Sequence, residues 1–364
     1  MAKAVPFFAR LSQLRDRLAR ADVDALLVTG LANVRYLTGF SGSNALVLVT
    51  PRDCVLFTDF RYATQVKQEV TAHASVRIEM QNLWTGLWAW LADTAGVERI
   101  GFESAHLLHR DFQRLLEQGT RWQWRPLLDE IESLRESKDA TEIACIERAV
   151  GMAERALAAT LQELRVGLTE TAVAGILEHH LRDQGSEGFP FATIVASGPR
   201  AALPHARAGD RLVTSGDLVL IDFGSVSDGY CSDITRTVVI GRASARQKEV
   251  YEVVQRANVK SSGALRVGMV GKDADAVARE YIDGLGFGEA FGHSLGHGIG
   301  LEIHEAPRLA KSADSPLPAG AVVTIEPGVY LADWGGVRIE DDVLVTTAGP
   351  RVLTSFTREL LEIA

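Results

Sequence analysis

Cysteines and long apolar runs are scarce in this 364-residue sequence. The three cysteines, Cys54, Cys145 and Cys231, are an odd number without paired spacing, which argues against a disulfide framework and is typical of a reducing cytoplasm. No stretch reaches the roughly 18 uninterrupted apolar residues of a membrane span. Arginines interrupt the leucines before residue 21, so no signal peptide is expected there. We therefore expect a cytoplasmic protein without a membrane partner.

Positive charge is also in short supply. The 38 lysines and arginines are outnumbered by 47 aspartates and glutamates, which leaves a net charge of −9. No basic stripe is present that could replace phosphate counterions, so a nucleic-acid partner is not expected. At roughly 150 residues per domain, the length predicts two domains, each large enough for its own core.

The first third of the chain, residues 1–134, has the pattern of an α/β domain. A polar and apolar helical pattern runs to about residue 21. Short apolar runs bounded by glycine and proline follow at 24–29, 44–50 and 54–58, and such runs predict strands covered on both faces. Tryptophans at helical spacing follow at 84, 88 and 90, and a further short strand is predicted at 99–102. No constellation of reactive side chains occurs in this third.

A second domain, residues 135–364, is predicted to begin near a capping box. Asp139 and Glu142 have the spacing of a helix start whose two side chains cap each other's backbone amides. Helical patterns follow to about residue 164 and at about 169–184, 245–265 and 273–285. Gly185 is predicted to end the second of these helices in a left-handed conformation. Strand-like segments lie between these helices.

Five residues that can bind metal follow one another along this second domain: Asp222, Asp233, His297, Glu326 and Glu340. Four carboxylates and one imidazole are donors that can bind and roughly neutralise two divalent ions. Such ions would lower the pKa of a water between them toward neutrality and make it a nucleophile. The sequence therefore predicts a two-metal hydrolase.

The first two ligands are predicted to meet across a hairpin. The apolar runs 218–223 and 232–240 flank a turn-rich hexamer, so Asp222 and Asp233 should face each other near the turn. Burying a carboxylate in such a strand costs on the order of several kcal/mol unless a cation compensates it. A metal would remove this cost for both carboxylates.

The remaining ligands are predicted at positions where a site can open. Pro327 ends a strand directly after Glu326. Alternation along 337–345 places Arg338 on the same face as Glu340, as the side chain that orients it. The three glycines around His297 are expected to leave a ligand free access to the imidazole.

These segments resemble those of the pita-bread metallopeptidases, which include methionyl aminopeptidases, aminopeptidase P and prolidase. The resemblance lies in the spacing of eleven between Asp222 and Asp233 and of seven between His297 and His304, and in the segments 325–328 and 338–342. It covers the chain from about residue 134 onward, and residues 23–62 as a creatinase/prolidase-type N-terminal domain. It implies an α/β N-terminal domain followed by an α+β pita-bread catalytic domain.

The resemblance also implies roles for individual side chains. His304 is similar to the histidine that contacts the scissile amide and stabilises the oxyanion. His293 and His205 resemble histidines that contact the substrate, while Glu326 would be both ligand and proton shuttle. Arg338 and Tyr330 are expected on the substrate side, and Phe191 is a further candidate for the pocket. The other histidines, 73, 106, 109, 179 and 180, match no motif of this family.

The implied reaction is hydrolysis of the Xaa-Pro bond at a peptide N-terminus, with manganese favoured and cobalt or zinc as substitutes. We favour aminopeptidase P slightly, and prolidase, which is restricted to dipeptides, is the alternative. A prolidase needs a cation for the dipeptide carboxylate, and Arg35 and Arg61 of the N-terminal domain are candidates. A homodimer is expected from the family. A metal-free creatinase-like enzyme and a non-catalytic binding protein are disfavoured by the complete ligand set.

Overall fold

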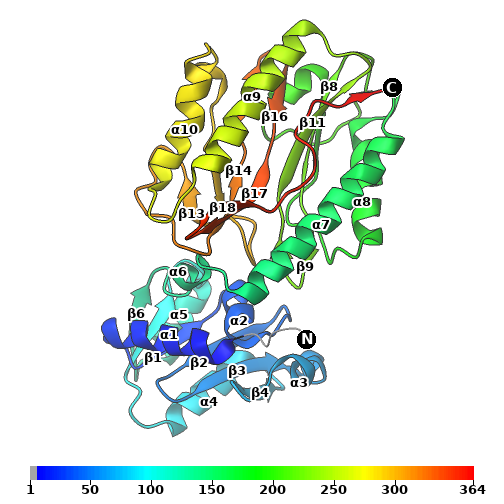
Figure 1. Cartoon of the computed structure of the whole chain (residues 1–364). Coiled ribbons are helices and arrows are strands. Elements are labelled where there is room, and N and C mark those ends of the chain that lie inside the picture. The colour runs from blue at the N-terminus through cyan, green and yellow to red at the C-terminus, as the bar shows by residue number, and fades with distance from the viewer. Residues whose placement is uncertain (1–5) are drawn as a thin grey trace. The chain divides into compact units, whose positions relative to one another are not determined.

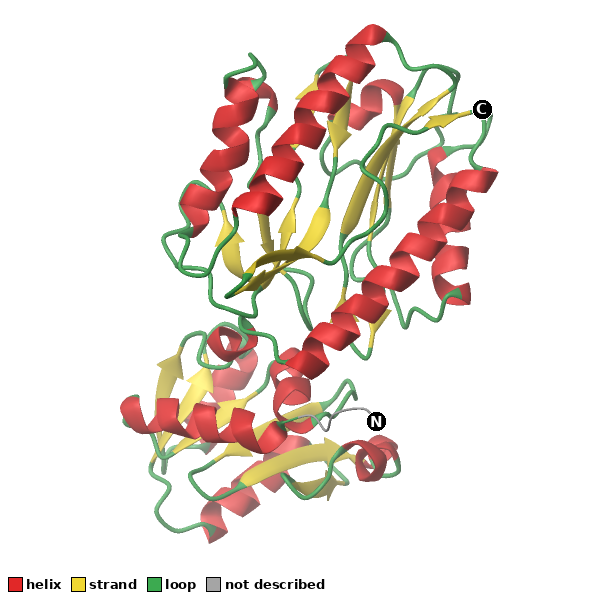
Figure 2. Cartoon of the chain, in the orientation of Figure 1, coloured by secondary structure: helices red, strands yellow, loops and turns green. Residues whose placement is uncertain are grey.

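The computed structural model describes residues 6–364 and divides into two compact units between Arg135 and Glu136. Figures 1 and 2 show that each unit combines helices and strands. Each has its own buried core. No helix within residues 6–364 is both long enough and apolar enough to cross a membrane.

The first unit is built on one six-stranded mixed sheet with strand order β4-β3-β2-β1-β5-β6. The central strand β1 pairs antiparallel with β2 and parallel with β5. Its strands are β1 (Ala25–Val28), β2 (Ala45–Val49), β3 (Cys54–Asp59), β4 (Ser75–Glu79), β5 (Arg99–Glu103) and β6 (Gln123–Leu127). Its helices are α1 (Phe7–Arg20), α2 (Leu31–Thr38), η1 (Phe60–Tyr62), α3 (Gln65–Glu69), α4 (Leu83–Asp93), α5 (His109–Gln118) and α6 (Glu132–Arg135).

The strands predicted in this unit are confirmed. β1, β2, β3 and β5 fall on the apolar runs, and nearly every residue of these strands is buried, as expected when both faces are covered. The tryptophan stripe lies on α4, where the rings pack against the core of this unit. The short helix α2 and the edge strands β4 and β6 were not predicted, because β4 and β6 are only partly buried and show no continuous apolar run.

The second unit contains a four-stranded sheet, β19-β11-β8-β7, and a five-stranded sheet, β13-β12-β14-β17-β18. The strands of the first sheet are β7 (Ile194–Ser197), β8 (Leu218–Phe223), β11 (Ile234–Ile240) and β19 (Glu362–Ile363). Those of the second are β12 (Gly296–Gly298), β13 (Glu305–Leu309), β14 (Val322–Ile325), β17 (Asp341–Thr346) and β18 (Gly349–Val352). Two separate two-stranded hairpins are also present: β9 (Val226–Ser227) with β10 (Tyr230–Cys231), between β8 and β11 in the chain, and β15 (Gly328–Leu331) with β16 (Gly335–Arg338), between β14 and β17.

Helices cover this unit in two pairs. In Figure 1, α7 (Ala140–Glu163) and α8 (Glu170–Asp183) lie beside β8 and β11, whereas α9 (Ala245–Ala264) and α10 (Gly271–Asp283) lie on the other side. The first pair packs its apolar face on the first sheet, and the second pair packs on residues from both sheets. Two 3-10 helices, η2 (Gly198–Ala202) and η3 (Gly288–Ala290), complete the unit. The α/β plus α+β architecture expected from the resemblance is the one observed.

The predicted helix signals of this unit are also confirmed. Asp139 accepts hydrogen bonds from the Thr141 and Glu142 amides, and the Glu142 side chain caps Asp139 in return. Gly185 has a φ of 93° just beyond α8, a left-handed conformation that glycine adopts without strain.

Candidate metal centre

The first two carboxylates lie on neighbouring strands of the four-stranded sheet. β8 and β11 pair antiparallel as predicted, but the register places Asp222 opposite Thr235. Asp233 precedes β11 and is therefore a diagonal neighbour of Asp222 on the same face, not its direct partner. Both residues are buried, and within residues 6–364 the Oδ1 atom of each has no hydrogen-bond partner. A buried acceptor without a partner is expensive unless a ligand satisfies it.

Glu326 and Glu340 reach the same place from the other strands. Glu326 follows β14 directly, and its backbone amide donates to the carbonyl of Leu295. Glu340 lies between β16 and β17, and its Oε2 accepts a hydrogen bond of 2.6 Å from the Thr235 hydroxyl. That bond fixes one oxygen of the carboxylate and leaves the other available for a cation.

His297 presents one nitrogen to these carboxylates. Its Nδ1 lies 3.1 Å from the carbonyl of Gly298, which favours a proton on Nδ1 and a lone pair on Nε2. Nε2 lies 3.7 Å from Asp233 and 3.6 Å from Glu326. Burial lowers the pKa of His297 to about 4, so the imidazole is neutral, as a metal ligand must be.

The glycines beside His297 lie in close contact with neighbouring backbone. A Cβ on Gly296 would lie 2.0 Å from the carbonyl oxygen of Thr324, and one on Gly298 would lie 2.2 Å from that of Ala306. Both atoms belong to the backbone next to β12, which cannot yield. These glycines are therefore needed for close strand packing.

The buried carboxylates of this centre would be stabilised in their charged form by a cation. Burial, followed by the charges of neighbouring carboxylates, raises the pKa values of Asp233 and Glu340 well above their usual range. Burial raises the pKa of Glu326 to about 8, against the opposing charge of Arg338. Asp233, His297 and Glu340 each offer one ligand atom, all within 4.8 Å of one another. With the orphaned oxygens of the aspartates, this donor set fits divalent metal.

Arg338 and Tyr330 form a layer behind the centre. The expected partner of Arg338 was Glu340, but its guanidinium binds Asp222 Oδ2 at 2.5 Å. It also donates to the Tyr330 hydroxyl at 2.8 Å, and that hydroxyl lies 2.8 Å from His293 Nε2. Asp222, not Glu340, is therefore the carboxylate that Arg338 orients. Tyr330 supports His293 and Arg338, and does not appear among the described residues that line the cavity.

A cavity of about 880 Å³ opens on the centre. Its wall includes the five predicted ligands, three histidines and three further side chains: Asp222, Asp233, His297, Glu326, Glu340, His205, His293, His304, Arg338, Phe191 and Arg308. Burial lowers the pKa of His293 to about 4 and also lowers that of His304. Both imidazoles are therefore neutral near pH 7 and can each donate one N–H.

Arg308 is a functional candidate that the sequence reasoning missed. It lies on β13 opposite His297, and its positive charge contributes to the low pKa values of His297 and His304. Its guanidinium makes no hydrogen bond or ion pair with another of the residues 6–364. The available signal was its position four residues after His304, an even spacing that would place both side chains on one side of a continuous strand.

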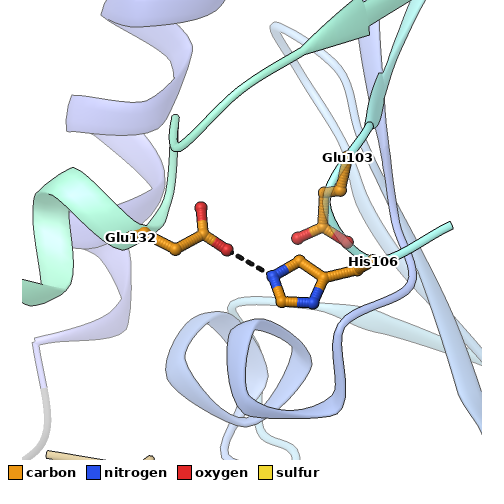
Figure 3. A group of neighbouring side chains, drawn as sticks. All are labelled: Glu103, His106 and Glu132. Atoms are coloured by element: carbon orange, nitrogen blue, oxygen red, sulfur yellow. Dashed lines mark hydrogen bonds and ion pairs between the residues drawn. The ribbon is translucent and has the colours of Figure 1, made fainter. Parts of the chain in front are cut away.

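A second group of metal-type side chains lies in the first unit. Figure 3 shows Glu103, His106 and Glu132 pointing toward one another. Glu103 accepts from the Thr29 and Gly30 amides, and Glu132 Oε1 accepts from His106 at 2.7 Å. The side chain of Asn33 donates to both carboxylates, at 2.6 and 2.5 Å. Protein donors thus satisfy this group, unlike the orphaned oxygens of Asp222 and Asp233, so it is a hydrogen-bonded network.

Comparison with known proteins agrees with this geometry. Residues 144–347 match the model of metallopeptidase family M24, and residues 10–137 match the creatinase/prolidase N-terminal domain. The chain is 35% identical to a Xaa-Pro dipeptidase of Pyrococcus horikoshii, covering 97% of this chain and 98% of that protein.

Solved structures agree over nearly the whole chain. A Xaa-Pro dipeptidase from Bacillus anthracis superposes with a TM-score of 0.94 at 36% identity, covering 98% of this chain and 99% of that one. An X-Pro aminopeptidase from Thermotoga maritima superposes with a TM-score of 0.90 at 38% identity, covering 97% and 99%. The chain therefore belongs to metallopeptidase family M24, carries a creatinase/prolidase N-terminal domain and is a metallo-exopeptidase.

Proposed function

We propose that this protein is a Xaa-Pro dipeptidase, that is, a prolidase. The observation that carries the proposal is that the carboxylate-rich candidate metal centre, three histidines and the unpaired cation of Arg308 line the same cavity. Relatives and solved structures of nearly full-length coverage that are named Xaa-Pro dipeptidases support it. Xaa-Pro dipeptidase therefore replaces aminopeptidase P as the main proposed activity.

Side chains of this chain would bind and orient the dipeptide. Asp222, Asp233, His297, Glu326 and Glu340 would hold two divalent ions, with manganese favoured by the oxygen-rich donor set. When bound, such ions polarise the scissile carbonyl and acidify the attacking water. His304 would donate its N–H to the developing oxyanion, and His205 and His293 would contact the substrate on either side. Glu326 would pass a proton to the leaving nitrogen.

Arg308 is our candidate for binding the free carboxylate of the dipeptide. Of the two arginines first considered, Arg61 is exposed and already engaged with Asp59, at 2.9 and 2.8 Å. Arg308 lies in the cavity itself, in the strand that follows His304. Guanidinium and carboxylate can form two parallel hydrogen bonds, which selects a substrate that ends at proline.

The test is hydrolysis of Ala-Pro, Ala-Pro-amide and Ala-Pro-Ala with added manganese, and with chelator as control. A prolidase is expected to cleave Ala-Pro fastest. Arg308→Met is expected to raise KM for Ala-Pro about 10- to 100-fold, as loss of a charge-assisted pair does, and to leave that for Ala-Pro-amide nearly unchanged. Arg351→Met, which removes an exposed arginine paired with Glu147, is the matched control.

Aminopeptidase P is the second candidate, because the Thermotoga maritima structure at 38% identity is named an X-Pro aminopeptidase. Faster cleavage of Ala-Pro-Ala than of Ala-Pro would favour it. Absence of metal-dependent cleavage of all three peptides would refute both proposed activities.

A homo-oligomer and a cytoplasmic location remain predictions. Gel filtration can check the first, and cell fractionation can check the second.

A further inference from the structure

A buried carboxylate that the proposed reaction does not use lies at the start of α8. The side chain of Glu170 is 0% exposed. Glu170 does not occur among the described residues that line the cavity. A carboxylate so deeply buried must have its desolvation compensated by hydrogen bonds or opposite charge. Its partners therefore indicate what the charge is for.

The donors to Glu170 come from the two ends of one segment, residues 197–209. Ser197 donates its amide and its hydroxyl to Oε1, at 2.8 and 2.9 Å. The amide of Gly209 donates to Oε2 at 3.1 Å. Arg200 Nε lies 3.2 and 3.0 Å from the two oxygens. One carboxylate thus ties the beginning of the segment to its end.

His205 lies within this segment and on the cavity wall. Two arginines hold the backbone on either side of it. Arg200 donates to the carbonyl of Arg207 at 2.6 Å, and Arg338 donates to the carbonyl of Pro204 at 3.2 Å. The imidazole of His205 makes no hydrogen bond or ion pair within residues 6–364. Its position therefore depends on the backbone that the two arginines hold.

We propose that Glu170, acting through Arg200, is the positioning residue of His205 and so controls the affinity for the peptide. The proposal rests on the proposed function, in which His205 contacts the substrate. Glu170 orients Arg200 through both carboxylate oxygens, and Arg200 holds the backbone two residues beyond His205. None of the predicted metal ligands lies in residues 197–209. Loss of Glu170 therefore affects substrate binding rather than turnover.

The test is a double-mutant cycle between Glu170→Gln and His205→Ala, measured as kcat and KM for the faster of Ala-Pro and Ala-Pro-Ala with manganese. With His205 present, Glu170→Gln is expected to raise KM about 10-fold while kcat stays within about twofold. In the His205→Ala background, the same change is expected to raise KM less than about twofold, because the positioned group is gone. Equal increases in both backgrounds would overturn the proposal.

Two further variants are measured, one that breaks the same linkage at Arg200 and one that serves as a control. Arg200→Lys retains a cation for Glu170 but loses the second nitrogen that binds the Arg207 carbonyl. It is expected to show the same non-additive rise in KM, and an additive rise would overturn the proposal even if Glu170→Gln did not fold. Asp24→Asn is the matched control, because Asp24 also accepts from an arginine and two backbone amides, but within the first unit. Its KM should not change.

The wild-type chain separates the two hypotheses. If it cleaves neither peptide with manganese, the proposed function fails and the role of Glu170 fails with it. If it cleaves one of them and the cycle is additive, only the role of Glu170 fails.

Discussion

His304 lies beside the metal centre without being one of its predicted ligands. Its ring centroid is 4.4 Å from that of His297, and burial lowers its pKa, so it is neutral and can donate one N–H. We expect His304→Ala to lower kcat about 10²- to 10³-fold, the loss typical of one oxyanion donor. Manganese content, measured by elemental analysis, should equal that of the wild type.

His109→Ala is the control for this substitution, because His109 is exposed on α5 in the first unit. It should leave kcat and metal content unchanged. Loss of bound manganese in His304→Ala would contradict the role proposed for His304, since it would make the imidazole a ligand.

The raised pKa of Glu326 predicts how the stability of the metal-free protein changes with pH. Its pKa is raised from an ordinary value of about 4.3 to about 8, so its contribution to stability is present below about pH 4.3 and lost as pH rises toward 8. With chelator, Tm should fall between pH 5 and 8. Manganese should abolish this fall, because the cation compensates the charge. Glu326→Gln should flatten the chelated profile, and an unchanged profile would show that other groups cause it.

At the residue scale, the sequence predicted which side chains line the cavity better than it predicted their partners. The five predicted ligands and the three histidines all line the cavity, and each lies in a short segment with recognisable neighbours. Arg338 was assigned to Glu340 from strand alternation, but it binds Asp222, 116 positions away. Arg308 was missed because its only local signal, a spacing of four from His304, does not distinguish it from any other arginine in a strand.

At the scale of elements, β13 begins with a buried ion pair. Glu305 directly follows His304 and accepts a hydrogen bond of 3.1 Å from Lys138, whose side chain is 1% exposed. Removing one partner of a buried pair typically costs about 3–5 kcal/mol. We expect Lys138→Met to lower the free energy of unfolding of the second unit by about that amount, measured by urea denaturation.

A double-mutant cycle checks that prediction. Lys138→Met with Glu305→Gln should be less destabilised than the sum of the single variants, because no uncompensated charge remains. Lys272→Met is the control, since that ammonium is exposed and pairs with the exposed Asp314. A cost for Lys272→Met as large as that for Lys138→Met would contradict the argument from burial.

Elements with strong local signals were predicted well, and those without were not. The capping box at Asp139 and the apolar runs of β8 and β11 act within a few residues, so the sequence displays them. The small β9–β10 hairpin was not predicted: β9 falls within the predicted turn 224–229 and β10 directly after it, and two-residue strands are defined only by their pairing. The diagonal relation of Asp222 to Asp233 depends on the register between β8 and β11, the two strands that the β9–β10 hairpin connects.

At the scale of the whole molecule, the two units should differ in their response to acid. In the first unit, burial opposes ionisation of Glu132, but hydrogen bonds from His106 and Asn33 outweigh it and lower its pKa to about 2. Stability from Glu132 is therefore present above about pH 4.3 and lost as pH falls toward 2. Glu326 in the second unit has the opposite sign.

Calorimetry with chelator should reveal this difference. Between pH 5 and 3 the first unit should lose about 1–2 kcal/mol through Glu132, after allowance for solvent screening. Glu132→Gln should reduce that loss without changing the response of the second unit. Identical pH profiles of wild type and variant would contradict the assignment to Glu132.

The sequence by itself determined the family, the pairing of an α/β domain with an α+β catalytic domain, and the segments that carry the metal-type side chains. These follow from local patterns: strand-like apolar runs, helix caps and short segments around each ligand. Only the tertiary structure decided that Arg338 orients Asp222, that Arg308 reaches the cavity and that Glu170 ties down the segment of His205. Such contacts join residues far apart in the chain, so they depend on strand order and register, which no local pattern contains.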